Sequence, residues 1–325
     1  MFRHLHREPG FYKRLFLLAL PLILQNLITT SLGFVDTFMV GMLGQNELSA
    51  VTAANTPIYL LQIIILGLLS GLSVLASQYW GKGDTDSINR CMGVSLYAGL
   101  IIAVSVAAVL FFFPLHVMAL VTNNDLLIEL GAPYLRIVGL SYIFNTISSV
   151  YIGMQRSTEN PAMGMIVFGI SMLTNTGLNY ILIFGSFGAP RLGVVGAAIA
   201  TVIARYIEAI YLIIHTHRRE KTFIFAQGLY KSLYLPGAVV KKILLTGTPL
   251  MLNELFWSIG TTMISQSYST RGLTVVAATN IAGTVWNLFC VIMFAMGNAV
   301  SIIIGQQLGA GEIEEAKRTD NKLLF

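Results

Sequence analysis

Residues 92–113 read MGVSLYAGLIIAVSVAAVLFFF, a stretch of 22 residues without a single charged side chain. A helix rises about 1.5 Å per residue, and the hydrocarbon core of a bilayer therefore needs about 20 apolar residues in a row. Membrane β-strands need only about 10. The stretch is long enough to cross a membrane once as a helix, and it decides how the rest of the chain is interpreted.

Seven further apolar runs of comparable length surround this stretch, at residues 15–38, 51–79, 126–153, 162–184, 193–216, 243–268 and 275–307. The whole chain is 55% hydrophobic and 11% charged, whereas soluble domains carry about 25% charged residues. These features predict an all-α fold, a polytopic helical membrane protein with about eight spans.

The basic residues predict the orientation, because cytoplasmic loops retain Lys and Arg. With eight alternating spans, sixteen of the twenty Lys and Arg residues fall on the side of the N-terminus. We therefore expect a multi-pass protein of the plasma (inner) membrane with a cytoplasmic N-terminus. These charges are dispersed without stacking aromatic residues, so they indicate contact with membrane lipid and no nucleic acid.

Two further features concern processing and redox state. The first apolar run lacks a small-residue cleavage signature, so a cleaved signal peptide is not expected. Cys91 and Cys290 lie far apart without metal-ligand spacing, and both are interpreted as reduced, structural residues.

An internal repeat divides the chain. Shifted by 228 residues, the segment 21–90 aligns on 249–318 without a gap and with fifteen identities in seventy positions. The coincident residues include Pro21 with Pro249, Gln78 with Gln306, Gly81 with Gly309, Gly83 with Gly311 and Arg90 with Arg318. The predicted organisation is an N-lobe of six spans at 1–217, a cytoplasmic linker at 218–242, and a partial C-lobe at 243–325 with two spans and the start of an amphipathic segment. Parallel repeats of this kind suit alternating access, and we expect four further spans in a complete second unit.

Asp36 lies toward the outer end of the first span. A charged side chain at the centre of a bilayer costs at least about 2.5–3.5 kcal/mol, so such residues are candidates for function. Asp36 has polar neighbours but no basic residue at helical spacing. From the residues alone, a cation site and a carboxylate that merely faces water at the outer interface are equally good interpretations.

Other polar residues within the spans also call for a choice. Asn175 and Asn179 stand at i and i+4, so their amide oxygens could share one cavity as ligands of a hard cation, or the two amides could simply bond a neighbouring helix. Arg205 and Glu208 stand at i and i+3 and are interpreted as a structural ion pair. Glu254 follows Pro249 closely in the seventh span, where it is either part of an ion or substrate site or a buried, protonated glutamate.

Several motifs carry a family resemblance. They are DTFMVGMLG at 36–44, QYWGKG at 78–83, QRSTENP at 155–161, NTGLNY at 175–180 and GVVGAAIAT at 193–201. Together they resemble the multidrug and toxic compound extrusion (MATE) family over nearly the whole chain. The resemblance implies twelve helices in two six-helix lobes around a central cavity, and a secondary active antiporter that exports organic cations or drugs in exchange for Na⁺ or H⁺. This sequence departs from the pattern because it ends after the eighth span.

The resemblance also implies roles for individual residues. Asp36, Asn175, Asn179 and Thr201 match the N-lobe cation site, with Na⁺ possible at Asp36, Asn175 and Asn179, and Glu254 matches an ion or substrate site of the second lobe. Some relatives carry a carboxylate at the position of Asn179. The expected partners are small organic cations and membrane lipid, the expected cofactor is none beyond Na⁺ or H⁺ as coupling ion, and the chain is expected to be a monomer.

Alternative functions are a lipid-linked oligosaccharide flippase of the wider superfamily and a truncated, non-transporting fragment. A flippase cavity should be basic in order to hold a diphosphate, whereas the unpaired charges predicted within the spans are Asp36 and Glu254. An enzyme is not expected, because the five histidines are dispersed. ATP hydrolysis is not expected either, since the chain has no Gly-x-x-x-x-Gly-Lys-Ser/Thr run.

Overall fold

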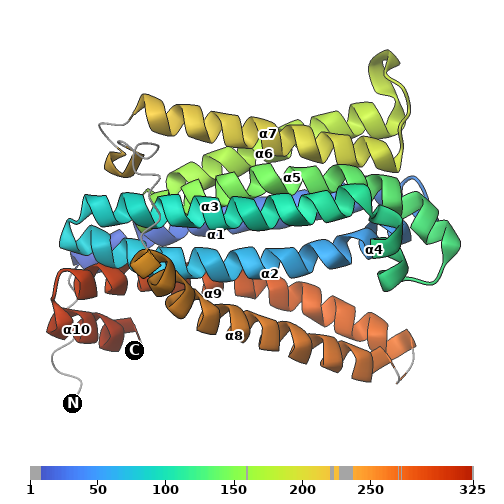
Figure 1. Cartoon of the computed structure of the whole chain (residues 1–325). Coiled ribbons are helices and arrows are strands. Elements are labelled where there is room, and N and C mark those ends of the chain that lie inside the picture. Colours follow the sequence, from blue (N-terminus) through green and yellow to red (C-terminus); the bar gives the residue numbers. More distant parts are fainter. Residues whose placement is uncertain are drawn as a thin grey trace.

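Long helices that run roughly alongside one another make up most of the molecule (Figure 1). The computed structural model describes residues 9–158, 160–219, 223–226, 237–269, 271 and 273–323. Within these ranges no strand occurs, and the predicted all-α class is confirmed. The long helices are α1 (Pro9–Gly41), α2 (Gln45–Lys82), α3 (Thr85–Phe112), α5 (Asp125–Ser157), α6 (Ala162–Phe184), α7 (Val194–Arg218), α8 (Gly237–Ser269) and α9 (Leu273–Gly309).

Each long helix overlaps one of the predicted apolar runs. Within the described residues, seven helices contain a segment long and apolar enough to cross a membrane. Helix α8 is not among them, because Asn253 and Glu254 lower the hydropathy of its apolar middle. It nevertheless lies beside α2 and α9 in the bundle (Figure 1).

The shorter elements refine the predicted boundaries. Helix α4 (Pro114–Val121) was not expected; Pro114 is its first residue, where the missing N–H of proline costs nothing. The 3₁₀ turns are η1 (Ser186–Gly188) and η2 (Ile224–Ala226). Helix α8 already begins at Gly237, within the predicted linker, whereas 220–222 and 227–236 of that linker lie outside the described residues. The segment after the eighth span forms α10 (Ile313–Leu323).

The predicted repeat is visible in the turns that follow α2 and α9. Gly83 and Gly311 have φ of 75° and 83°, in the left-handed region that favours glycine. The N–H of Asp84 bonds the carbonyl of Tyr79 at 2.9 Å, and Glu312 bonds Gln307 at the same distance. All these residues correspond under the shift of 228 positions, so the two turns have the same backbone structure.

The two copies also touch one another at equivalent positions. A Cβ added to Gly81 would overlap the backbone carbonyl of Gln306, and a Cβ added to Gly309 would overlap that of Gln78. Gln78 and Gly81 correspond to Gln306 and Gly309 in the repeat. Each copy therefore places its glycine against the equivalent glutamine of the other copy. Helices α2 and α9 therefore cross on an approximate two-fold axis, backbone against backbone.

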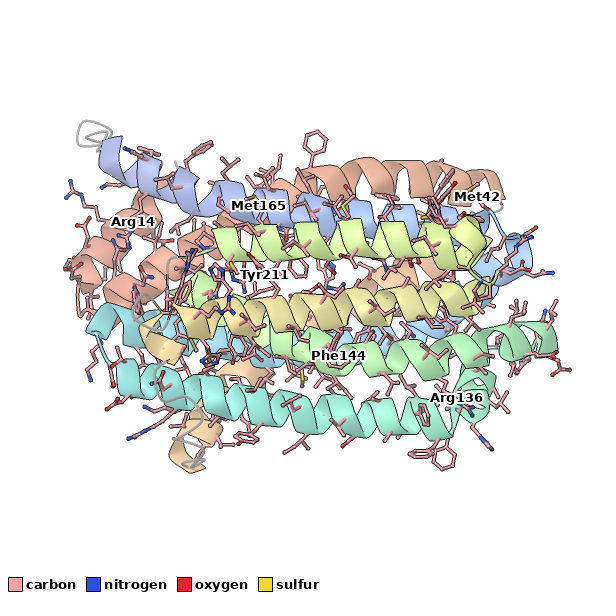
Figure 2. The ribbon with its side chains drawn as sticks, turned by 90° about the horizontal axis from the view of Figure 1, so that it is seen from above. Arg14, Met42, Arg136, Phe144, Met165 and Tyr211 are labelled. Atoms are coloured by element: carbon pink, nitrogen blue, oxygen red, sulfur yellow. The ribbon has the colours of Figure 1, made fainter. Side chains whose placement is uncertain are left out.

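The ends of the bundle can be told apart by labelled residues. Figure 2 shows Arg14 at one end and Met42 and Arg136 at the other. Beside the α2–α9 crossing, Arg14 Nη2 donates to Gln306 Oε1 at 2.9 Å, and Gln306 Nε2 donates to the carbonyl of Ser157 at 3.1 Å. Polar contacts thus tie α1, α5 and α9 together at that end.

Cys91 and Cys290 are both free and buried.

Helix α5 holds the first six long helices together through its contacts with α2, α3 and α7, and α6 packs between α1 and α7. One hydrophobic cluster of this unit includes Val40, Ala54, Leu135, Ile183 and Ala197, from five different helices. Packing these apolar side chains against one another also brings polar groups of α1, α6 and α7 close together.

Candidate functional site

A hydrogen-bonded chain of polar side chains joins α1, α6 and α7 inside the bundle. Asp36 of α1 is half-buried, and its Oδ1 accepts a hydrogen bond from Asn179 Nδ2 of α6 at 2.7 Å. The short distance is typical of a bond to a charged acceptor. Thr30, Ser31 and Thr37, the polar neighbours of Asp36 in the sequence, make no bond to it in the described part of the chain; its partner comes from a helix 143 residues away.

The chain continues along α6 and reaches α7. Asn179 Nδ2 also donates to Asn175 Oδ1 at 3.0 Å, and Asn175 Nδ2 donates to Thr201 Oγ1 at 3.2 Å. The Thr201 hydroxyl in turn donates to the carbonyl of Ala197 at 3.0 Å. The structure therefore brings together all four residues that the family resemblance implied as one site.

The sequence left open whether the two amide oxygens share a cation cavity or the amides bond a neighbouring helix. In the structure Asn175 Oδ1 accepts from Asn179, and Asn179 Oδ1 is buried without a hydrogen-bond partner among the described residues. The side chain of Asn179 is fully buried. Leaving a buried carbonyl without a hydrogen bond costs about 1–3 kcal/mol. A cation or a hydrogen-bond donor that bound Asn179 Oδ1 would remove this cost, so this oxygen is a candidate ligand beside Asp36.

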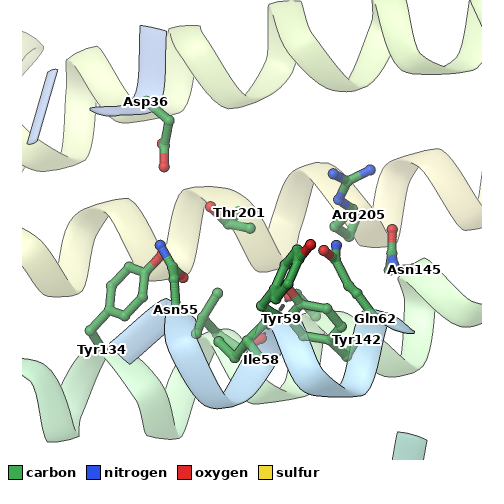
Figure 3. Close-up of a pocket in the computed structure, with 12 residues that line it drawn as sticks. Asp36, Asn55, Ile58, Tyr59, Gln62, Tyr134, Tyr142, Asn145, Thr201 and Arg205 are labelled. Atoms are coloured by element: carbon green, nitrogen blue, oxygen red, sulfur yellow. Dashed lines mark hydrogen bonds between the residues drawn. The ribbon is translucent and has the colours of Figure 1, made fainter. Parts of the chain in front are cut away.

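Two cavities meet at this chain. The larger has a volume of about 320 Å³ and the smaller about 180 Å³, and Asp36, Thr201 and Arg205 line both. Figure 3 shows the larger cavity with Asp36 pointing into it from α1 and Thr201 and Arg205 along α7. Asn175 lines the smaller cavity. A small ion in either cavity would therefore have access to the Asp36 carboxylate.

The opposite wall of the larger cavity comes from residues that the sequence analysis did not identify. Helix α2 contributes Asn55, Tyr59 and Gln62 at i, i+4 and i+7, and α5 contributes Tyr134, Tyr142 and Asn145 (Figure 3). Tyr134 Oη lies 3.5 Å from Asn55 Oδ1. The missed signal was the helical spacing of polar residues within otherwise apolar spans, which places them on one face.

Arg205 and Glu208 form an ion pair on α7. Arg205 Nη1 lies 2.7 Å from Glu208 Oε2, and the Arg205 guanidinium also lies 5.8 Å from the centre of the Phe168 ring. Glu208 is fully buried, and its Oε1 has no hydrogen-bond partner among the described residues. The sequence analysis interpreted the pair as structural, yet Arg205 also lines both cavities beside Asp36.

Glu254 of α8 lies outside the hydrogen-bonded chain. It lines a third cavity of about 240 Å³ together with Tyr59, Gln62, Tyr142 and Asn145. Those four residues also line the larger cavity at Asp36, so the two spaces share a wall. Within the described residues no hydrogen bond or ion pair involves Glu254.

The donor set indicates which ions the Asp36 site could hold. No group of three or more His, Cys, Asp or Glu side chains with metal-binding geometry occurs in the described part of the chain. The site instead combines one carboxylate with amide and hydroxyl oxygens. Oxygen ligands of this kind suit hard cations, and a single carboxylate suits a monovalent charge or a proton.

Comparison with known proteins agrees with this architecture. The MatE family model matches residues 21–181 and 249–325. The chain is 30% identical over 323 residues to the multidrug resistance protein MdtK of Edwardsiella ictaluri, covering 94% of this chain and 66% of that protein. It is 25% identical over 312 residues to the probable multidrug resistance protein YoeA of Bacillus subtilis, covering 96% and 67%. The chain thus spans about two thirds of the length of these relatives.

Solved structures share the fold. A multidrug resistance MATE family transporter of the MOP superfamily in its outward-facing conformation superposes with a TM-score of 0.83 at 21% identity, covering 95% of this chain and 68% of that one. The Vibrio cholerae MATE transporter VcmN in its bent form gives 0.85 at 22% identity, covering 97% and 70%. At these identities the likeness establishes the helical architecture alone.

Proposed function

The chain belongs to the MatE family, and on this premise we propose that it works in a secondary antiporter that exports organic cations or drugs in exchange for Na⁺ or H⁺. Its membrane-length helices make it a multi-pass membrane protein, the relatives reported above are named as multidrug resistance proteins, and the similar solved structures are of MATE transporters. The proposed orientation, with the N-terminus in the cytoplasm, rests on the distribution of Lys and Arg.

The observation that carries the proposal is the position of the Asp36 carboxylate. It is held at 2.7 Å by the Asn179 amide, at the boundary between two cavities. A carboxylate in a bilayer is costly unless a partner compensates its charge. A cation that visits Asp36 supplies this compensation, and the amide donor supplies part of it when the cation has left.

Ion binding has a simple structural route. The Asn179 amide donates its NH₂ group to Asp36 and Asn175 while its own oxygen has no hydrogen-bond partner among the described residues. Half a turn of this amide would direct Oδ1 toward Asp36, where it could bind Na⁺ together with the carboxylate or accept a hydrogen bond from the protonated Asp36 carboxyl group. We propose this rotation as the local event of coupling, because it links the charge at Asp36 to the α6–α7 contact at Thr201.

Coupling further requires that ion and substrate bind the two conformations of the transporter with different affinities. The substrate space we propose is the larger cavity, with its tyrosine and amide wall. Tyrosine faces attract organic cations through their π-electrons, and Tyr59 and Tyr142 line this cavity and the one at Glu254.

The test measures accumulation of the fluorescent cation ethidium in an efflux-deficient bacterium that expresses the protein. We expect expression to lower ethidium accumulation, and Asp36→Asn to abolish this effect at an equal level in the membrane. Glu129→Gln is the matched control, because this substitution also replaces a carboxylate by an amide, but at an exposed position of α5. Export by Asp36→Asn at the wild-type rate would refute the proposed function.

A further inference from the structure

The Arg205–Glu208 ion pair on α7 lies next to the proposed cation site. Arg205 lines both cavities that contain Asp36, and it is the only basic residue, as Asp36 is the only carboxylate, among the described residues that line them. The guanidinium is engaged by Glu208 at 2.7 Å. The side chain of Glu208 is fully buried, whereas that of Arg205 is 21% exposed.

Arg205 is associated with two carboxylates, with Glu208 through the ion pair and with Asp36 through the two cavities that both residues line. Thr201 lies four residues before Arg205 on the same face of α7, and it belongs to the hydrogen-bonded chain that ends at Asp36. Arg205 and Asp36 both line the two cavities at this chain. The Arg205 guanidinium is bonded to Glu208, which lies three residues further along α7.

The charges decide what this arrangement does. Asp36 and the Arg205–Glu208 pair together carry one negative charge, which a monovalent cation can neutralise. Without the Glu208 charge the group would be neutral, and Arg205 would face Asp36 as its nearest carboxylate within the described cavity wall. An internal Asp36–Arg205 pair would then compete with the cation, because opposite charges attract strongly where water is scarce.

We propose that Glu208 is a positioning residue that holds the Arg205 guanidinium away from Asp36 and thereby leaves the Asp36 carboxylate to the coupling ion. This inference rests on the proposed function of Asp36. It assigns to Glu208 a role in ion affinity although the structure places Glu208 in neither of the two cavities.

The experiment measures ion binding by the purified chain in lipid nanodiscs. Radioactive Na⁺ alone and protons alone, through uptake reported by a pH indicator, serve as the two probes, and comparison of wild type with Asp36→Asn identifies the ion that binds through Asp36. We expect Glu208→Gln to weaken the binding of that ion by about tenfold or more, as for a carboxylate that gains a neighbouring positive charge. The double variant Arg205→Gln/Glu208→Gln should return to within about threefold of wild type, because the competing charge is gone.

A purely structural role of Glu208 would give a different pattern. The double variant would then bind as weakly as Glu208→Gln, or Glu208→Gln would bind like wild type; either result overturns the inference while Asp36→Asn still loses the ion. Wild-type binding by Asp36→Asn would instead refute the proposed function itself.

Two further variants keep the test decisive. If Glu208→Gln does not yield monodisperse protein, Arg205→Gln alone is measured; the inference predicts binding as tight as wild type or tighter, and weaker binding overturns it. Glu129→Gln, which removes an exposed carboxylate of α5, is expected to leave ion binding unchanged.

Discussion

Helices α1 and α8 are copies of one segment with different chemistry. Pro21 and Pro249 align and lie inside their helices. The acidic residues do not align: Asp36 corresponds to Ile264, and Glu254 corresponds to Asn26. Asp36 is bonded to Asn179 at 2.7 Å, whereas Ile264 has 55% of its surface exposed. The repeat therefore preserves the scaffold, while the carboxylates are placed independently in each copy.

The crossing of α2 and α9 shows the opposite behaviour. There the equivalent residues make the same contact in both directions, since Gly81 lies against Gln306 and Gly309 against Gln78. Backbone packing tolerates no added atom on either side, which explains why these residues coincide in the two copies. Symmetry is kept where backbones touch and is lost at the carboxylates Asp36 and Glu254.

The strongest test of this asymmetry compares the two acidic residues directly. We expect Asp36→Asn to lower the affinity of the chain in nanodiscs for its coupling ion by about 100-fold or more, the upper range for loss of an interaction with a charged group. Glu254→Gln should change it by less than about tenfold, because Glu254 lies outside the hydrogen-bonded chain. Radioactive Na⁺ binding and proton uptake provide the measurement, and equal losses in the two variants would contradict the asymmetry.

The symmetric crossing can be broken from either side. Gly81→Ala and Gly309→Ala should each lower stability by about 1–3 kcal/mol, because the added methyl group meets a backbone carbonyl. Thermal unfolding in detergent, followed by circular dichroism, should show similar losses for both. The control is Gly297→Ala in α9, where no atom lies within 4 Å of the added Cβ; a loss there as large as in the two test variants would remove the crossing as the cause.

The amide of Asn179 sharpens the assignment of the coupling ion. Asn179→Ala removes a donor to the Asp36 carboxylate and also removes a potential Na⁺ ligand. We therefore expect the affinity for Na⁺ to fall by about tenfold. The affinity for a proton should rise, because in the wild type the hydrogen bond from Asn179 stabilises the charged carboxylate, and its loss makes protonation easier. Isothermal titration with each ion distinguishes the two effects. Equal weakening of both would show that Asn179 only maintains the fold.

A smaller difference is expected at the two equivalent turns. Asp84 caps α3 by accepting bonds from the Ser87 N–H at 3.0 Å and the Ser87 hydroxyl at 2.7 Å. The position equivalent to Ser87 is Glu315, which has no hydroxyl to offer Glu312. Asp84→Ala should therefore cost about 1 kcal/mol of stability, and Glu312→Ala less. The comparison of unfolding midpoints tests this; equal costs would show that the backbone turn, not the cap, is responsible.

The same cap predicts a dependence on pH. The two bonds from Ser87 lower the pKa of Asp84 below its usual value. A group whose pKa is lower in the folded state stabilises that state above its unfolded pKa, about 3.9 for Asp. The difference in stability between wild type and Asp84→Ala should accordingly be constant at neutral pH and shrink as the pH falls below about 4. A difference that grows with acidification would have the wrong sign.

Much of the scaffold could be predicted because its signals are local. Apolar runs of membrane length can be recognised in consecutive residues, and the repeat can be recognised by aligning two such segments, in which Gly83 coincides with Gly311. Helix α4 was missed because it has only 8 residues and lies directly after an apolar run. Helix α8 was placed correctly, although its start within the predicted linker was not.

Only part of the candidate site could be predicted from the sequence. Asp36, Asn175 and Asn179 could be singled out because a polar group within a membrane span is costly. From the residues alone, however, the two interpretations of Asp36 were equally good, and bonding to a neighbouring helix was the simpler interpretation of the two asparagines. The polar face of α2 at Asn55, Tyr59 and Gln62 was overlooked, since helical spacing indicates a shared face and not what that face meets.

The sequence by itself determined that the chain forms membrane-length helices, that its second part repeats the first, and which carboxylates need compensation, because hydropathy, turn conformation and charge belong to short segments. Only the tertiary structure decided that Asn179 bonds Asp36 across 143 positions, and that Arg205, which is paired with Glu208, lines the same cavities as Asp36. Such pairings depend on how separate helices pack, and the free energy of packing is a property of many distant residues at once.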